Sequence, residues 1–242
     1  MKTIRTYYKE HIERNKKMKR WISGILGLLV LLSVIVFIRT YNAIMKPNTM
    51  ITNDSEVSLY IHSDDDFETI KNKLYSDSVI INRRSFEWLA KKLDYPKYIK
   101  SGHYVIKDGM NNNQLLNMLR SGSQIPIDFT FNNIRTIEQF AKEADDQLEL
   151  DSLSILKALN EDSLLKEMGF KKESFASLFI PNTYELYWNI NPKDFIEKMT
   201  NEYKKFWNDT RLQKAKEINL TPIEVSILAS IVDKETTKTS EM

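Results

Sequence analysis

An uncharged run of eighteen residues, Trp21 to Ile38, constrains this chain more than any other feature of its sequence. At about 1.5 Å per residue, a helix of this length measures about 27 Å, close to the roughly 30 Å hydrocarbon core of a bilayer. The twenty residues before the run contain eight Lys or Arg and two Glu, whereas residues 39–53 contain only Arg39 and Lys46. The positive-inside rule then predicts a cytoplasmic N-terminus and an exported chain from about residue 40.

A cleaved signal peptide is the competing interpretation of this run. Signal peptides have shorter apolar cores and end at a small-x-small site, which the sequence Tyr41-Asn42-Ala43 does not supply. We therefore expect an uncleaved anchor, with a cytoplasmic tail over 1–20, a transmembrane helix over 21–38 and a polar linker over 39–53.

The composition excludes several kinds of chemistry. The chain has no Cys, which removes disulfides, thiolate metal sites and thiol nucleophiles together. Its three His residues, His11, His62 and His103, are too few and too scattered for a His-based metal site or a Ser-His-Asp triad. Much of the positive charge lies in the N-terminal tail, so the exported part is close to neutral and a nucleic-acid partner is not expected. Any catalysis must rest on carboxylates, and we expect no metal and no cofactor.

The exported residues alternate between strand-like and helix-like patterns, which predicts an α+β fold. Residues 54–125 read as a small module of strand, two helices, strand and helix, and residues 126–242 read as a second domain that begins with a strand. The expected elements of the module are Val57–Ile61, a helix through Leu74, Arg83–Leu93, Gly102–Ile106 and Asn113–Leu119.

The segment Pro181–Trp188 is the first with a possible chemical role. An extended backbone would place Asn182, Tyr184 and Trp188 on one side, where an amide, a phenol and an indole could hydrogen-bond to sugars and stack on them. The alternative is an ordinary aromatic strand packed under the helix Pro192–Trp207. The pattern alone favours this packing interpretation.

The last helix is well marked. Thr221-Pro222-Ile223-Glu224 is a capping box with Pro at the first helical position. Leu228, Ile231, Val232 and Glu235 then follow at offsets of 0, 3, 4 and 7, which places a carboxylate in line with an apolar stripe. Such a carboxylic acid could act as a general acid, or it could simply reach solvent where the stripe ends. The residues alone leave the two interpretations even.

Three segments resemble the MltG/YceG family of membrane-anchored endolytic murein transglycosylases. The stretch SGHYVIKDGMNNNQLLNMLRSG is similar to the LysM-like module of that family. The segment Pro181-Asn182-Thr183-Tyr184-Glu185 is similar to its proline-(aspartate or asparagine)-threonine-tyrosine motif. The segment Ile227–Thr236 is similar to its leucine-alanine-serine signature, which contains an invariant glutamate. Many members have aspartate where this chain has Asn182. The motifs occur in the family's order and, with the anchor, cover nearly the whole chain from residue 21.

The resemblance implies a fold and a set of site residues. It implies a LysM-like module over 54–125 and a catalytic domain over 126–242, with Glu235 as catalytic acid and base. It also implies Asn182 and Tyr184 as cleft residues, and we expect Glu185 and Trp188 to bind substrate with them. Family members continue past the position of Met242 with further cleft segments, so we expect the sequence to be C-terminally truncated, its catalytic domain incomplete and the chain inactive or nearly so.

The implied activity is cleavage of the bond between N-acetylmuramic acid and N-acetylglucosamine in peptidoglycan glycan strands. One carboxylate suffices for such a lytic transglycosylase, a lyase that leaves 1,6-anhydro ends and limits strand length. The implied location is the bacterial plasma (inner) membrane, and penicillin-binding cell-wall synthases are an implied partner class. The alternatives are a non-catalytic, membrane-anchored scaffold that binds peptidoglycan and, third, a muramidase-type hydrolase whose second acid would be Glu185.

Overall fold

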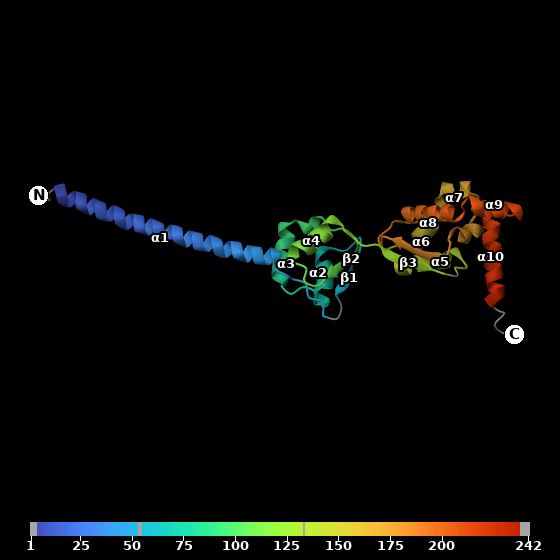
Figure 1. Ribbon diagram of the computed structural model, residues 1–242, viewed down its shortest axis with the longest axis horizontal. Helices are drawn as coiled ribbons and strands as arrows, with labels where there is room; N and C mark the ends of the chain where they lie inside the picture. The colour runs from blue at the N-terminus through green and yellow to red at the C-terminus, as the bar shows by residue number, and fades with distance from the viewer. Residues whose placement is uncertain (1–3, 53–54, 133, 238–242) are drawn as a thin grey trace. The chain divides into compact units, whose positions relative to one another are not determined.

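The computed structural model describes residues 4–52, 55–132 and 134–237 and consists of helices with short strands (Figure 1). The mixed α+β class is thereby confirmed. The chain divides into two compact units. Unit 1 comprises 1–57, 67–99 and 106–121, and unit 2 comprises 58–66, 100–105 and 122–242.

The first helix, α1 (Ile4–Met45), contains the apolar segment Trp21–Met45, whose mean hydropathy is 2.7. The segment is long and apolar enough to cross a membrane, and 0% of its most apolar part is buried against the protein. It is therefore consistent with a single-pass membrane protein. The helix continues past the expected end at Ile38 because nothing breaks it before Pro47.

The next elements follow the expected order of strand, two helices, strand and helix. β1 (Glu56–Ile61) pairs with β2 (Gly102–Lys107) in a two-stranded sheet. The helices are α2 (Phe67–Ser76), α3 (Arg83–Lys92), the short 3-10 helix η1 (Tyr95–Lys97) and α4 (Asn112–Ser121). The identity of this part as a LysM-like module stays a prediction.

The segment 39–53, expected to be a polar linker, is integrated into unit 1 as far as the structure describes it, which is to residue 52. Its first residues belong to α1, and Asn48 and Thr49 are only 4% and 3% exposed. Isolated bridges pair Pro47 with Asn111 and Thr49 with Ile80. Sequence polarity predicted a linker here because it does not distinguish a solvated Asn from one that is buried and hydrogen-bonded.

A buried network of asparagines joins the end of α1 to unit 1. The side-chain amide of Asn48 donates to Oδ1 of Asn112 at 2.7 Å, and Oδ1 of Asn48 accepts from the backbone N–H of Asn82 at 2.7 Å. The amide of Asn112 donates to the carbonyl of Ala43 at 2.8 Å and to Oγ of Ser85 at 3.0 Å. Because Ala43 lies in the last turn of α1, the membrane helix enters the folded unit without a flexible joint.

Unit 2 is built on an antiparallel pair of strands with helices around it (Figure 1). Besides most of β1 and β2, unit 2 contains β3 (Ile127–Phe131), α5 (Ile137–Gln147), α6 (Ser152–Glu161), α7 (Ser163–Glu167), η2 (Lys172–Leu178), β4 (Asn182–Leu186), α8 (Pro192–Phe206), α9 (Asp209–Glu217) and α10 (Pro222–Thr237). Several helices start at capping side chains that accept a hydrogen bond from the backbone N–H three residues later. These caps are Thr136, Asp151, Asn191 and Asn208.

The core of unit 2 is rich in phenylalanine. Phe129 of β3, Phe140 of α5 and Phe195 of α8 are fully buried, and their ring centroids lie 5.6–6.1 Å apart. Such aromatic contacts contribute large buried area with a defined geometry. They hold the β3–β4 pair against the helices and thereby fix the strand that carries most of the predicted binding residues.

We predict that the asparagine network stabilises unit 1. Asn112→Ala removes two donors and leaves the buried amide of Asn48 without one of its acceptors, so the free energy of unfolding should fall by about 1–3 kcal/mol. Asn117→Ala is the matched control because Asn117 lies on the same helix, is exposed and bonds only locally, to Asn113. Urea unfolding of the detergent-solubilised protein measures both, and equal stability of the two variants would contradict the prediction.

Candidate functional site

The helix α10 carries the predicted catalytic residue, and its start is fixed by the expected capping box. The backbone N–H and the hydroxyl of Thr221 each donate to Oε2 of Glu224 at 2.7 Å, and the backbone N–H of Glu224 donates to Oγ1 of Thr221 at 3.3 Å. Ile223 and Val225 pack against the core of unit 2, and α10 also contacts η2 and α9. The first turn is thus anchored to the core.

Beyond its first turns, α10 presents an apolar stripe to solvent. Ile227, Leu228, Ile231 and Val232 are 45–53% exposed, and the side chain of Glu235 is exposed one turn later. The stripe is the one that the sequence spacing predicts. The stripe and the side chain of Glu235 are therefore both open to solvent.

Tyr184 lies in the core of unit 2 rather than on a cleft surface. Its side chain is 6% exposed, its ring stacks on Phe131 at 5.8 Å, and its hydroxyl donates to the carbonyl of Ile180. Burial, with a smaller contribution from the nearby charge of Glu202, raises the pKa of Tyr184 to about 12. The structure therefore favours the packing interpretation of this tyrosine, and its predicted contact with sugar has no exposed ring surface to use here.

Trp188 is also buried, at 8% exposure. Its ring meets Tyr60 and His62 edge-on at centroid distances of 5.1 and 4.8 Å, and its carbonyl accepts from the backbone N–H of Glu149 at 2.8 Å. The neighbouring Tyr187 is 53% exposed instead. Strand alternation predicts a shared side for residues 184 and 188 correctly, but that side faces the protein interior.

Asn182 and Glu185 are exposed, and they belong to opposite faces of β4. Asn182 stands opposite Phe131 in the register, and its Oδ1 accepts from the backbone N–H of Thr183 at 2.8 Å. Glu185 stands opposite Asp128. The outer face of the strand pair therefore holds two carboxylates side by side, a pairing that is destabilising unless something else offsets it.

Sequence reasoning missed Asp128. A strand was predicted over Pro126–Phe131, but nothing in a single sequence shows which strand it pairs with or in what register, so Asp128 could not be placed beside Glu185. The neighbouring pair Thr130 and Thr183 lies on the same face, with 2.8 Å between the hydroxyl oxygens.

The predicted site residues lie on elements with different packing partners. Glu235 is on α10, which packs on η2 and α9, whereas the other four lie on or just after β4, which pairs with β3. A polar hollow of about 380 Å³ lies between the start of α5 and η2 and contains none of the five predicted residues. Its lining residues are Thr136, Ile137, Glu138, Lys172, Glu173 and Ala176. Within the described residues, no group of three or more His, Asp or Glu could hold a metal ion.

Comparison with known families assigns the chain. The model of the YceG-like family matches residues 59–242, well over half of the sequence. The chain therefore belongs to the YceG-like family. Among solved structures, it is similar to the crystal structure of a YceG-like protein from Listeria monocytogenes, with 20% identity and a TM-score of 0.37, over 67% of this chain and 59% of that one. No curated protein matches it.

We predict that the capping box holds the start of α10. Thr221→Ala should lower the stability of unit 2 by about 1 kcal/mol, because the freed N–H of Glu224 loses its acceptor. Thr221→Ser keeps the hydroxyl and is the control. Thermal unfolding followed by circular dichroism distinguishes the two, and equal losses in both variants would show that the cap contributes nothing.

The same capping box predicts a pH dependence. Hydrogen bonds from the backbone and hydroxyl of Thr221 lower the pKa of Glu224 from its ordinary value of 4.5. A lowered pKa means that the contribution of Glu224 is fully present above about pH 4.5 and is lost as the pH falls through the lower value in the folded state. The stability difference between wild type and Thr221→Ala should therefore shrink in acid.

Proposed function

We propose that this protein is an endolytic lytic transglycosylase of peptidoglycan, with Glu235 as its catalytic acid and base. Membership of the YceG-like family and the match of Ile227–Thr236 to the family's glutamate signature support the proposal. The single observation that carries it is the position of Glu235. It is an exposed carboxylate at the end of an exposed apolar stripe, on a helix whose start is fixed to the core.

The proposed reaction uses this carboxylate twice. Protonated Glu235 donates its proton to the glycosidic oxygen between N-acetylmuramic acid and N-acetylglucosamine, and the bond from that oxygen to C1 of the muramoyl residue breaks. The resulting carboxylate then takes the proton of the muramoyl C6 hydroxyl, and the C6 oxygen bonds to C1. The products are a free glucosamine 4-hydroxyl and a 1,6-anhydro-muramoyl end, and no water is consumed.

One observation fits this reaction better than hydrolysis. A usual glycoside hydrolase needs two carboxylates on either side of the scissile bond. Along the sequence, the carboxylate nearest to Glu235 is that of Asp233, and two residues at this spacing on an ideal helix are about 200° apart, so the sequence offers no second acid beside Glu235. The hydrolytic alternative would need Glu185 as its second acid, and Glu185 lies on β4 opposite Asp128.

The membrane helix supports a location beside newly made glycan. The charge bias before Trp21 favours a cytoplasmic N-terminus, which would place both units outside the plasma membrane. We propose glycan strands as the substrate and penicillin-binding cell-wall synthases as the partner class. Asn182 and Glu185 are the exposed candidates for substrate contact, and a LysM-like role of the first module would add weak glycan binding.

We predict that Glu235→Gln abolishes most of the activity of the protein. Glutamine keeps the shape of the side chain but cannot donate and reclaim a proton, so turnover of uncrosslinked peptidoglycan should fall by at least about 10²-fold. Glu217→Gln makes the same chemical change on the exposed surface of the neighbouring α9 and should leave turnover unchanged. Mass spectrometry of the wild-type products should show 1,6-anhydro ends, lighter by one water than hydrolytic products.

Each other outcome selects a different function. Reducing ends formed by addition of water would make the protein a hydrolase, with Glu185 and Asp128 as the next residues to replace. Full activity in Glu235→Gln would remove this residue from the mechanism. Retention on peptidoglycan without any cleavage by the wild type would favour the alternative of a non-catalytic, membrane-anchored scaffold.

We also predict the topology. A reporter enzyme fused before residue 4 should report the cytoplasm, because eight basic residues precede the apolar run. A reporter placed after residue 60, at the C-terminus so that β1 stays intact, should report the exported side. The reverse pattern would overturn the orientation. Recovery of a mature chain that begins near Ala43 would identify a cleaved signal peptide instead of an anchor.

A further inference from the structure

The distance between the membrane span and the folded part of unit 1 is very short. From Arg39, the first charged residue after the apolar run, to Ala43, which is bonded to Asn112, there are four helical residues, or about 6 Å. The headgroup layer of one leaflet is about 5–8 Å thick, taken as half the difference between the whole bilayer and its hydrocarbon core. With Arg39 at the edge of the hydrocarbon, the surface of unit 1 nearest to α1 must lie within or directly on the headgroups.

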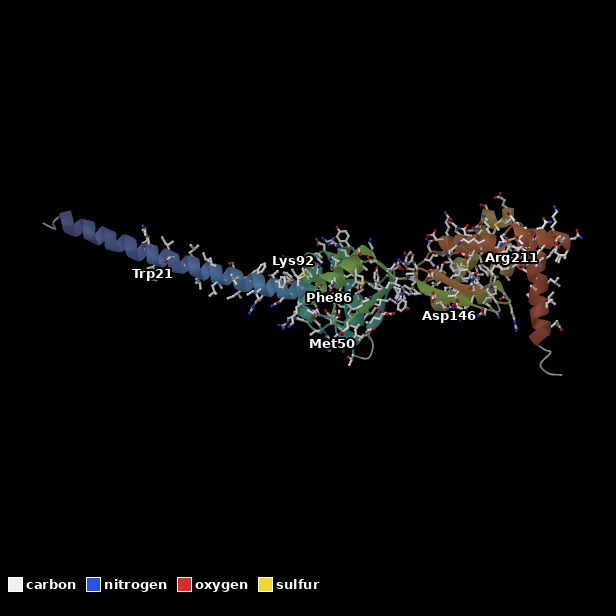
Figure 2. The ribbon with its side chains drawn as sticks, in the orientation of Figure 1. Trp21, Met50, Phe86, Lys92, Asp146 and Arg211 are labelled. Atoms are coloured by element: carbon white, nitrogen blue, oxygen red, sulfur yellow. The ribbon has the colours of Figure 1, made fainter. Side chains whose placement is uncertain are left out.

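Helix α3 forms part of that surface. It packs against α1, and its residue Ser85 shares the amide of Asn112 with the last turn of α1. Figure 1 shows α3 at the end of unit 1 where α1 enters, and Figure 2 labels Lys92 at the same end. The exposed side chains of α3 therefore belong to the surface of unit 1 that lies nearest to α1.

The outward face of α3 combines a tryptophan with basic residues. Arg84, Trp88 and Lys91 recur at intervals of four and three residues, which places them on one face of the helix, and Lys92 follows directly. Arg84, Lys91 and Lys92 are exposed, and Trp88 is 39% exposed. An exposed Trp flanked by Lys and Arg is the composition that membrane-water interfaces select.

The other charged residues of α3 interact within unit 1. Arg83 lies over the ring of Tyr75 at 4.3 Å, and Glu87 accepts a hydrogen bond from the hydroxyl of the same tyrosine at 2.9 Å. The negative charge of the helix is thus bound to a protein partner and is half-buried. The outward face is left with three positive charges.

We propose that the face of α3 formed by Arg84, Trp88, Lys91 and Lys92 binds the anionic phospholipid headgroups of the leaflet from which α1 emerges. The indole lies at headgroup level, and the basic side chains pair with lipid phosphates around it. Together with the asparagine network, this second attachment fixes the tilt of unit 1 on the membrane, which a single helix cannot do. The inference depends on the membrane anchor and is independent of the proposed catalytic activity.

The test follows Trp88 in the intact protein. The protein is placed in nanodiscs of equal parts phosphatidylglycerol and phosphatidylcholine, or in nanodiscs of phosphatidylcholine alone. The fluorescence of Trp88 is obtained by subtracting the emission of the matching Trp88→Phe variant from the emission of each protein. A spin-labelled lipid with its nitroxide near the headgroup should quench this signal, and aqueous iodide should not reach it. Raising the salt to about 0.5 M should weaken the quenching by the lipid, because the headgroup charge is screened.

A pair of charge variants separates specific docking from proximity alone. Arg84→Gln/Lys91→Gln should lower lipid quenching of Trp88 at least about twofold in the anionic discs, whereas Lys73→Gln/Lys107→Gln, which removes two charges from α2 and β2, should not. Iodide access to Trp88 in anionic discs equal to that in detergent would overturn the proposal. Equal quenching in both double variants, or in both lipid compositions, would overturn the claim that anionic headgroups are bound.

Discussion

The exclusion of charge and unpaired backbone groups from a lipid bilayer is the constraint on which the rest of this structure depends. Only a continuous helix satisfies its own backbone over the segment Trp21–Met45, and this helix passes directly into unit 1 through the carbonyl of Ala43. The bonds of Asn48 and Asn112 join the end of this helix to unit 1, so a membrane that held α1 would also fix the position of unit 1.

The asparagine network also explains how buried polar residues can stabilise unit 1. Asn48 and Asn112 are 4% and 1% exposed, and each buried amide has partners on both its donor and acceptor sides. A satisfied buried amide costs little, whereas an unsatisfied one costs a large part of a small domain's stability. The network therefore selects one arrangement of α1, α3 and α4.

In unit 2, the buried or exposed state of each predicted site residue distinguishes residues that pack in the core from residues that can contact a substrate. Tyr184 and Trp188 share the aromatic character of sugar-binding residues, but both rings are enclosed by other side chains. Glu235 and Asn182 are exposed, as is Glu185. Of these three exposed residues, Glu235 alone follows the exposed apolar stripe of α10, which is the observation behind its proposed role.

The sequence by itself determined the long apolar helix near the N-terminus, the order of the helices and strands, the capping box of α10 and the spacing of Glu235 on its stripe. Each of these depends on residues that are neighbours in the chain, such as Thr221 and Glu224. Only the tertiary structure decided that residues 39–52 are part of unit 1 and that Asp128 stands beside Glu185. It also decided that Tyr184 faces the core, because strand register and burial depend on contacts between segments far apart in the chain.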